Sequence, residues 1–253
     1  MPIALTRAVP RNLASCQLTH LQRSPIDVER AAVQHALYED ELRRAGCRVE
    51  HIEPAHDLPD SVFVEDTAVI FDEAAVLTRP GARSRQSEIG PVAEALARHR
   101  PLVRLTESAT LDGGDVLRLG RTIYVGISTR TNAEGARQLA DAAGPFGYSL
   151  RCVRVRGCLH LKSAVTAVDD RTVICNPDWI DARSFDGYDA IAVDPAEPFG
   201  ANVLRVRDAV ICAAAYERTA AVLRARGYDV RTVDVSELAK AEAGVTCCSL
   251  LVF

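Results

Sequence analysis

Side chains suited to nucleophilic and acid–base chemistry stand far apart in the 253-residue chain. Cys247 offers a thiol, His160 an imidazole, and Asp112 a carboxylate that could bond the second imidazole nitrogen and fix its tautomer. Glu65 and Asp66 are adjacent acids, which repel each other in a pocket unless a cation lies between them. A planar guanidinium suits that pair because its N–H groups form a fork. The set predicts attack of a thiolate on a guanidinium carbon.

Each of these residues also has an ordinary structural explanation. His160 lies between two leucines and could be a half-buried core histidine, and Cys247 could be a small core residue. Glu65 and Asp66 could be a solvated turn, and the glycines after Asp112 could serve only a loop. The functional interpretation is favoured because all of them fall at equivalent points of an internal repeat.

Two phrases alternate along the chain to make this repeat. One is the end of a helix, a Gly or Pro, and a short apolar strand, seen most clearly at the Gly-Tyr pairs that begin at 147, 187 and 227. The other is two short strands joined by a tight polar turn, in four copies at 67–78, 115–126, 163–175 and 201–212. A single strand at 249–253 lacks a partner, which the strand at 2–6 could supply.

The repeat predicts one α/β domain over residues 1–253, a ring of five units that each contain a hairpin, a helix and a further strand. The two chain ends would pair to close the ring. An open α/β sheet with irregular spacing is the alternative. In a ring, the segments before the hairpins meet at one end of the central axis, which would bring Cys247, His160, Asp112, Glu65 and Asp66 together.

Helix boundaries follow from capping and periodicity. Ser24 and Pro25 are typical of an N-cap and first helical position. Apolar residues at helical spacing then predict the buried face: Val33, Leu37, Tyr38, Leu42 and Ala45. Further helices are expected at 133–143 and 216–226.

Composition excludes several classes of protein. The net charge of −4 and the absence of a basic tract argue against nucleic-acid binding. No apolar run is long enough to span a membrane, and the first residues do not resemble a signal peptide, so a cytoplasmic location is expected. The eight cysteines form no CxxC pair or zinc-binding spacing, which indicates reduced thiols and no metal site.

Arginines follow two of the hairpins, at 79–85 and at 130. Most surface arginines are simply solvated. These could instead hold the carboxylate of an amino-acid substrate, since a guanidino amino acid needs recognition at both ends.

Six phrases, in order along the chain, resemble the dimethylarginine dimethylaminohydrolases. They are Pro59-Asp-Ser-Val-Phe-Val-Glu-Asp66, Thr78-Arg-Pro-Gly-Ala82, Leu111-Asp-Gly-Gly-Asp115, Arg130-Thr-Asn132, Leu159-His-Leu-Lys-Ser163 and Thr246-Cys-Cys-Ser249. The resemblance implies the pentein fold, a five-bladed α/β propeller. It also implies hydrolysis of N-omega-methylated arginine to citrulline and an alkylamine through a covalent thiouronium, without a cofactor.

The resemblance assigns a role to each matched residue. Cys247 is implied as the nucleophile with Cys248 as its neighbour, His160 as the acid–base group, and Asp112 as the partner of His160. The implied substrate-binding residues are Leu18 on a lid, Asp60, Glu65, Asp66, Arg85, Arg130 and the backbone carbonyl of Ala241.

Two departures and several alternatives stay open. Relatives often carry an Asp-Gly pair in the loop that reads Ala241-Glu-Ala-Gly-Val245 here, and position 86 is Gln. Both positions touch the pocket rim, so they bear on the breadth of substrates more than on the chemistry. An arginine deiminase is the nearest alternative, although its usual His-x-Asp phrase is replaced by His160-Leu161-Lys162. An amidinotransferase or a non-catalytic binding module are others. The expected partner is a small molecule, and a homodimer is left open.

Overall fold

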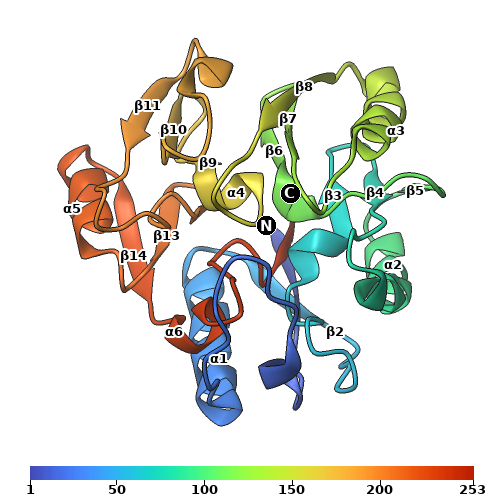
Figure 1. Cartoon of the computed structure of the whole chain (residues 1–253), viewed down its shortest axis with the longest axis horizontal. Coiled ribbons are helices and arrows are strands. Elements are labelled where there is room, and N and C mark those ends of the chain that lie inside the picture. The colour runs from blue at the N-terminus through green and yellow to red at the C-terminus, as the bar shows by residue number, and fades with distance from the viewer.

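The computed structural model describes all residues from 1 to 253 and shows five three-stranded sheets arranged around a central axis (Figure 1). The strands of each sheet are given from the axis outward. The first sheet consists of β15 (Leu250–Val252), β1 (Ile3–Arg7) and β2 (Arg48–Ile52), and the second of β3 (Ala68–Ile70), β4 (Ala75–Leu77) and β5 (Leu102–Arg104). The third consists of β6 (Val116–Leu119), β7 (Thr122–Ile127) and β8 (Ser149–Arg154), the fourth of β9 (Val165–Ala167), β10 (Thr172–Cys175) and β11 (Asp189–Ala192), and the fifth of β12 (Val203–Val206), β13 (Ala209–Ala213) and β14 (Asp229–Val233). The predicted ring of five units is confirmed, and the open sheet is wrong.

Every unit has the same connectivity. Its first two strands are antiparallel and its third strand is parallel to the second. A parallel connection must cross over, and a helix on the rim usually makes the crossing. Four such helices are present: α1 (Val28–Arg44), α2 (Ile89–Ala97), α3 (Ala133–Ala143) and α5 (Glu217–Ala225).

The fourth unit departs from the expected pattern. A single 3-10 turn at Ala182–Phe185 connects β10 to β11, where the repeat predicted a helix. The segment Asn176-Pro-Asp before this turn favours bends over helix, which explains the difference.

The first unit joins the two ends of the chain. β1 pairs with β15 in antiparallel register, with Ile3 opposite Val252, and with β2 in parallel register. Figure 1 shows both termini near the centre of the ring. The expected pairing of the strands at 2–6 and 249–253 is therefore confirmed.

The start of α1 differs from the prediction made from Ser24 and Pro25. The helix begins at Val28, and the Asp27 side chain caps it by accepting the Arg30 N–H. Val33 and Leu37 are 60% and 50% exposed, so that part of the predicted face is also wrong. The helices expected at 133–143 and 216–226 are present.

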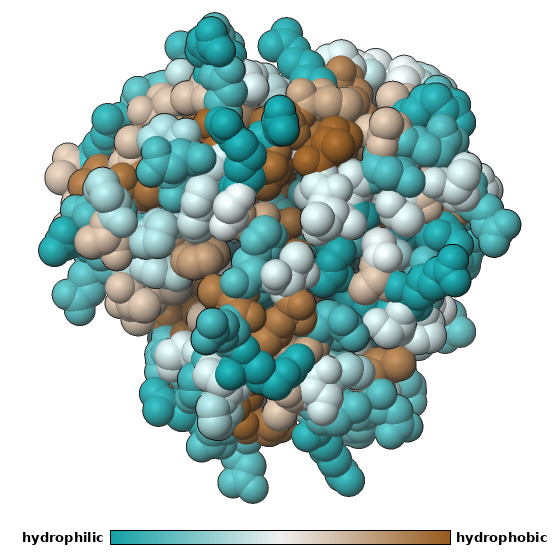
Figure 2. Space-filling model, viewed as in Figure 1, coloured by the Kyte–Doolittle hydropathy of each residue, from teal (hydrophilic) through white to brown (hydrophobic).

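Five hydrophobic clusters form the core, and each one lies between two neighbouring units. The largest joins α1 to strands β12, β13 and β14 through residues such as Tyr38, Leu42, Ile211 and Val233. No unit buries its apolar face alone, so adjacent units depend on each other. Figure 2 shows hydrophobic surface on this face as separate areas and hydrophilic residues along most of the rim.

Short helical turns lead into the first strand of three units. They are the 3-10 turns Val64–Thr67 and Gly113–Asp115, and α4 (Leu161–Ala164). Another short helix, α6 (Ser236–Ala239), precedes the loop that leads to β15. Glu65 and Asp66 lie in the first of these turns, Asp112 and His160 stand directly before the next two, and Cys247 lies in the loop after α6. None of the helices combines the length and apolar composition needed to cross a membrane.

Candidate active site

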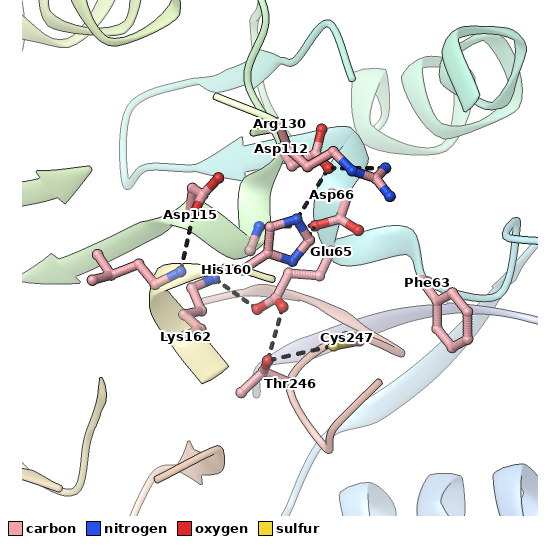
Figure 3. A network of polar contacts seen from close by, with 12 residues as sticks. Phe63, Glu65, Asp66, Asp112, Asp115, Arg130, His160, Lys162, Thr246 and Cys247 are labelled. Atoms are coloured by element: carbon pink, nitrogen blue, oxygen red, sulfur yellow. Dashed lines mark hydrogen bonds and ion pairs between the residues drawn. The ribbon is translucent and has the colours of Figure 1, made fainter. Parts of the chain in front are cut away.

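A small cavity at one end of the ring axis gathers most of the residues expected to form the site. Cys247 and His160 both line it, although they are 87 positions apart in the sequence. Figure 3 shows His160 at the centre of the surrounding polar network, with Cys247 on one side and Asp112 on the other. The full lining is Gln17, Asp60, Phe63, Asp66, Arg85, Arg130, Leu159, His160, Ala241, Glu242, Ala243 and Cys247.

A buried carboxylate orients the His160 ring. His160 Nε2 lies 3.0 Å from Asp112 Oδ2, and Asp112 is completely buried. Its second oxygen, Oδ1, accepts the Gly81 N–H at 2.8 Å. With both oxygens engaged, Asp112 is fixed, and it fixes the ring in turn.

Asp66 faces the opposite nitrogen of the same ring. Its Oδ1 lies 3.8 Å from His160 Nδ1 and accepts the Gly114 N–H at 3.0 Å, and its Oδ2 accepts from Arg85 Nη1 at 2.5 Å. Burial alone would raise the pKa of Asp66, but His160 and Arg85 lower it to about 2. Asp66 is therefore ionised and offers negative charge to the cavity.

Arg85 is occupied by its own chain. It donates to Asp66, to both carboxylate oxygens of Glu88, and to the backbone carbonyls of Asp60 and Phe63. These contacts hold Asp66 in place and leave Arg85 few free N–H groups for a substrate carboxylate. Arg130 is better placed for that role. It lines the cavity, its Nη1 lies 3.9 Å from Asp112 Oδ2, and its Nη2 donates to Thr19 Oγ1.

Glu65 lies outside the cavity lining, unlike its neighbour Asp66. Its Oε1 accepts from Lys162 Nζ at 2.6 Å, and its Oε2 accepts the Thr246 hydroxyl at 2.8 Å. The Glu65 N–H also donates to the Cys247 carbonyl at 3.1 Å. Glu65 thus anchors the segment that carries the thiol, and the structure does not pair it with Asp66 around a shared cavity.

The thiol of Cys247 is in its neutral form when the cavity is empty. Burial, together with the charges of Glu65 and Asp66, raises the pKa of Cys247 to about 12. The Gly244 N–H, 3.3 Å from Sγ, acts in the opposite direction. A thiol in this setting needs an incoming positive charge to ionise.

His160 is in its charged form under the same conditions. Burial lowers the pKa of the imidazole, but Asp66, Asp112 and Asp115 outweigh that effect and raise it to about 9. The site therefore holds an imidazolium that can donate a proton to a leaving group.

The residues expected at a lid and at the amino-acid end of a substrate also lie near the cavity. Asp60 accepts the Gln17 N–H with both oxygens, at 3.0 and 3.2 Å, and the buried Ala241 is on the lining. Leu18 is partly buried and packs against the largest core cluster, and it is absent from the cavity lining, where its neighbour Gln17 is present.

Sequence reasoning assigned no role to several residues that the structure places around the site. Asp115 is fully buried, accepts the Ser128 hydroxyl at 2.6 Å and the Leu161 N–H at 2.9 Å, and burial raises its pKa to about 6. Asp115 belongs to the same phrase, Leu111-Asp-Gly-Gly-Asp115, as Asp112, and this could have indicated that it lies near the site. Lys162, Asn202 and Glu242 had no comparable signal, because their partners are distant in sequence.

One group of potential metal ligands overlaps this network. Asp66, Asp112 and His160 each offer an atom, and these atoms lie within 4.8 Å of one another. The contacts described above already connect the same side chains, with opposite ring nitrogens facing the two acids. Those contacts account for the grouping without a metal.

The chain is similar to characterised proteins over nearly its whole length. Residues 15–250 match the family model described as "N,N dimethylarginine dimethylhydrolase, eukaryotic". An N(G),N(G)-dimethylarginine dimethylaminohydrolase of Streptomyces coelicolor is 42% identical over 98% of this chain and 95% of that protein. The corresponding Pseudomonas aeruginosa protein is 34% identical over 88% of this chain and 89% of that protein.

Solved structures show the same likeness. A cysteine-to-serine mutant of the Pseudomonas aeruginosa enzyme complexed with citrulline has a TM-score of 0.94 and 32% identity, with 98% of each chain covered. The N-terminal domain of ArgZ, a cyanobacterial arginine dihydrolase, has a TM-score of 0.88 at 19% identity, with 100% of this chain and 98% of that chain covered, and shares the fold.

Proposed function

The chain belongs to the dimethylarginine dimethylaminohydrolase family of pentein-fold hydrolases, and we propose that it converts N-omega-methylated arginines to citrulline and methylamine or dimethylamine. One observation carries the proposal: Cys247 and His160 open onto the same cavity, beside an ionised Asp66. That arrangement suits attack on a carbon of a planar cation.

The substrate's own charge starts the reaction. The guanidinium binds against Asp66, which offsets the negative charge that keeps Cys247 protonated. The thiol then loses its proton to solvent water, and Sγ attacks the guanidinium carbon. His160, already protonated, gives its proton to the methylated nitrogen, the C–N bond breaks, and the alkylamine leaves.

Water completes the turnover. The remaining thiouronium carbon is attacked by a water molecule, whose proton passes to the now neutral His160. The C–S bond breaks, the Cys247 thiolate is restored, and the second proton of the water is lost to solvent, so that the water oxygen becomes the ureido oxygen of citrulline. Asp112 keeps the imidazole in one orientation through both steps. None of these steps calls for a metal or an organic cofactor.

The amino-acid end of the substrate lies toward the lid in this proposal. Arg130 binds its carboxylate, while Asp60 and the Ala241 carbonyl bind its ammonium group and Leu18 covers it. Arg85 and Glu65 contribute by holding Asp66 and the Cys247 segment, respectively.

We also propose a cytoplasmic location. All eight cysteines are free thiols, which supports a reducing compartment. A homodimer is a further proposal, which sedimentation velocity at several concentrations tests.

The paired cysteines provide the test of the proposed function. We expect Cys247→Ser to lower citrulline formation from asymmetric dimethylarginine by about 10³-fold or more, because the weaker nucleophile replaces the thiolate. The matched Cys248→Ser variant should keep activity within about threefold, since Cys248 is buried in the core. Colorimetric citrulline assay, with thermal unfolding to check the fold, gives the readout.

Two further measurements sharpen that test. Mass spectrometry of acid-quenched protein should find the intermediate on the peptide that contains Cys247. Arginine at equal concentration should turn over far more slowly than dimethylarginine, and preference for arginine would favour a deiminase. Equal activity of both serine variants would remove Cys247 from its role.

A further inference from the structure

The loop formed by residues 17–21 is attached to the nucleophile segment by a single side chain. One carboxylate oxygen of Glu242 accepts the Thr19 N–H at 2.9 Å, and the other accepts the N–H groups of His20 and Leu21, each at 2.5 Å. Three consecutive amides therefore converge on a carboxylate more than two hundred positions away.

The same loop is tied to two other residues of the cavity. Asp60 accepts the Gln17 N–H, and Arg130 donates to Thr19 Oγ1 at 3.1 Å. Asp60, Arg130 and Glu242 all line the cavity that contains Cys247. The loop therefore covers this cavity through contacts with the lining itself.

Polar contacts dominate the attachment of the loop. Gln17, Thr19, His20 and Leu21 are exposed, and only Leu18 packs against the core. With so little apolar area buried, the free energy of closure depends on charge-assisted hydrogen bonds.

The backbone of Glu242 is shaped for this contact. Its φ of 60° lies in the left-handed region, which is unfavourable for a non-glycine residue. The turn continues to Gly244, whose N–H faces Cys247 Sγ. The residue that holds the loop and the amide that faces the thiol thus share one turn.

We propose that Glu242 is a positioning residue that latches residues 17–21 closed over Cys247. Closing the loop holds the bound substrate, and releasing the latch opens the route by which substrate enters and citrulline leaves. The kinetic part of this proposal rests on the proposed function, whereas the closure itself does not.

Hydrogen exchange of the free protein tests the closure directly. We expect the amides of residues 19–21 to exchange about tenfold faster or more in Glu242→Ala than in the wild type, because three acceptor contacts are lost. The exchange rate in Glu242→Gln should lie between those of the wild type and Glu242→Ala. The side-chain carbonyl oxygen of Gln still accepts a hydrogen bond, whereas its NH₂ group is a donor that faces one N–H without bonding to it. Glu53→Ala is the matched control, because Glu53 is exposed and makes no side-chain hydrogen bond or ion pair. Unchanged exchange in both Glu242 variants overturns the latch.

Steady-state kinetics separates positioning from a general loss of structure. For Glu242→Ala we expect KM for dimethylarginine to rise about tenfold while kcat stays within about twofold or increases. A fall in kcat with unchanged KM contradicts the proposal. Glu242→Gly relieves the left-handed strain, so it should unfold at a higher temperature than Glu242→Ala and still show the raised KM. If the wild type forms no citrulline, the proposed function fails and the exchange data alone decide the latch.

Discussion

At the scale of single residues, four buried acids set the protonation of one imidazole and one thiol. Asp66 and Asp112 contact His160 on opposite nitrogens, the charge of Asp115 also acts on the ring, and Glu65 lies beside the thiol segment. Burial together with Glu65 and Asp66 raises the pKa of Cys247, while Asp66, Asp112 and Asp115 raise the pKa of His160 against the effect of burial. The thiol is therefore neutral and the ring charged in the free protein, whereas both are charged in the attacking state.

This difference of one proton makes a prediction about pH. The attacking form, thiolate with imidazolium, holds one proton fewer than the form that dominates below the His160 pKa of about 9. We therefore expect kcat/KM to rise about tenfold per pH unit up to about 9 and to level off above it, since the next proton is lost near the Cys247 pKa of about 12. Asp115→Asn keeps an acceptor for the Leu161 N–H but removes a charge that raises the His160 pKa, so the break should move to lower pH.

A stopped assay between pH 6 and 10 for both proteins measures the break. Asp141→Asn, an exposed acid on α3, serves as the control. A flat profile, or an unshifted break in Asp115→Asn, would contradict the assignment.

The sequence predicted which residues meet at the site better than it predicted the role of each one. Cys247, His160, Asp112 and Asp66 meet because the repeat places them at equivalent points, and a repeat is visible in one sequence. The task of Glu65 depends on Lys162, 97 positions away, and that of Arg85 on four separate partners. Contacts of this kind follow from packing and leave no local pattern.

At the scale of elements, the turns before the hairpins determine the site. The 3-10 turn at Gly113–Asp115 packs against the turn at Val64–Thr67, so that two backbones approach without intervening side chains. A Cβ on Gly114 would lie 2.6 Å from His160 Nδ1 and 2.9 Å from Asp66 Oδ1. Glycine is needed there for a close approach, since neither side chain can retreat from its partners.

Gly114→Ala should therefore damage the site more than the fold. We expect kcat/KM to fall about 10²-fold or more, because displacement of His160 or Asp66 by an ångström disrupts alignment. Gly90→Ala is the matched control: Gly90 lies in α2, a Cβ there meets nothing within 4 Å, and the change should leave activity intact and raise stability by about 0.5–1 kcal/mol. Urea unfolding and the citrulline assay measure the two effects, and near-normal activity of Gly114→Ala would refute the packing argument.

The helix and strand boundaries that were predicted correctly are those that the local sequence determines. The Gly-Tyr pairs do end helical or turn segments, with Gly147, Gly187 and Gly227 at φ of 81°, 101° and 90°. The start of α1 was wrong because a tertiary contact decides it: the Asp27 N–H donates to Glu237 in α6, 210 positions away. Its buried face is likewise shifted toward Gln34, whose side chain bonds Ser236.

At the scale of the whole molecule, stability depends on the closure of the ring. All five hydrophobic clusters span neighbouring units, so a missing unit would expose two apolar faces. The first unit closes the ring by pairing β1 with β15. We propose on this basis that residues 1–253 fold as one cooperative domain.

A circular permutant tests that closure. In this permutant a short Gly-Ser linker joins Phe253 to Met1, and the new ends lie between the exposed Glu107 and Ser108. The permuted protein should fold and keep activity within about tenfold, because β1 and β15 already lie side by side. A truncation that lacks residues 250–253 should lose cooperative unfolding and activity, since β1 and the cluster around Leu5 lose their cover. Circular dichroism melts and the citrulline assay decide the outcome, and an active truncation would show that closure is dispensable.

The pairing of β1 with β15 also has a consequence during synthesis. Strands β3 to β14 belong to four blades that a nascent polypeptide can begin to assemble while still on the ribosome. The remaining blade needs both β1 and β15, which are far apart in the sequence, and Cys247, the proposed nucleophile, lies just before β15. If Cys247 has that role, translation keeps the emerging protein catalytically silent until β15 has been made.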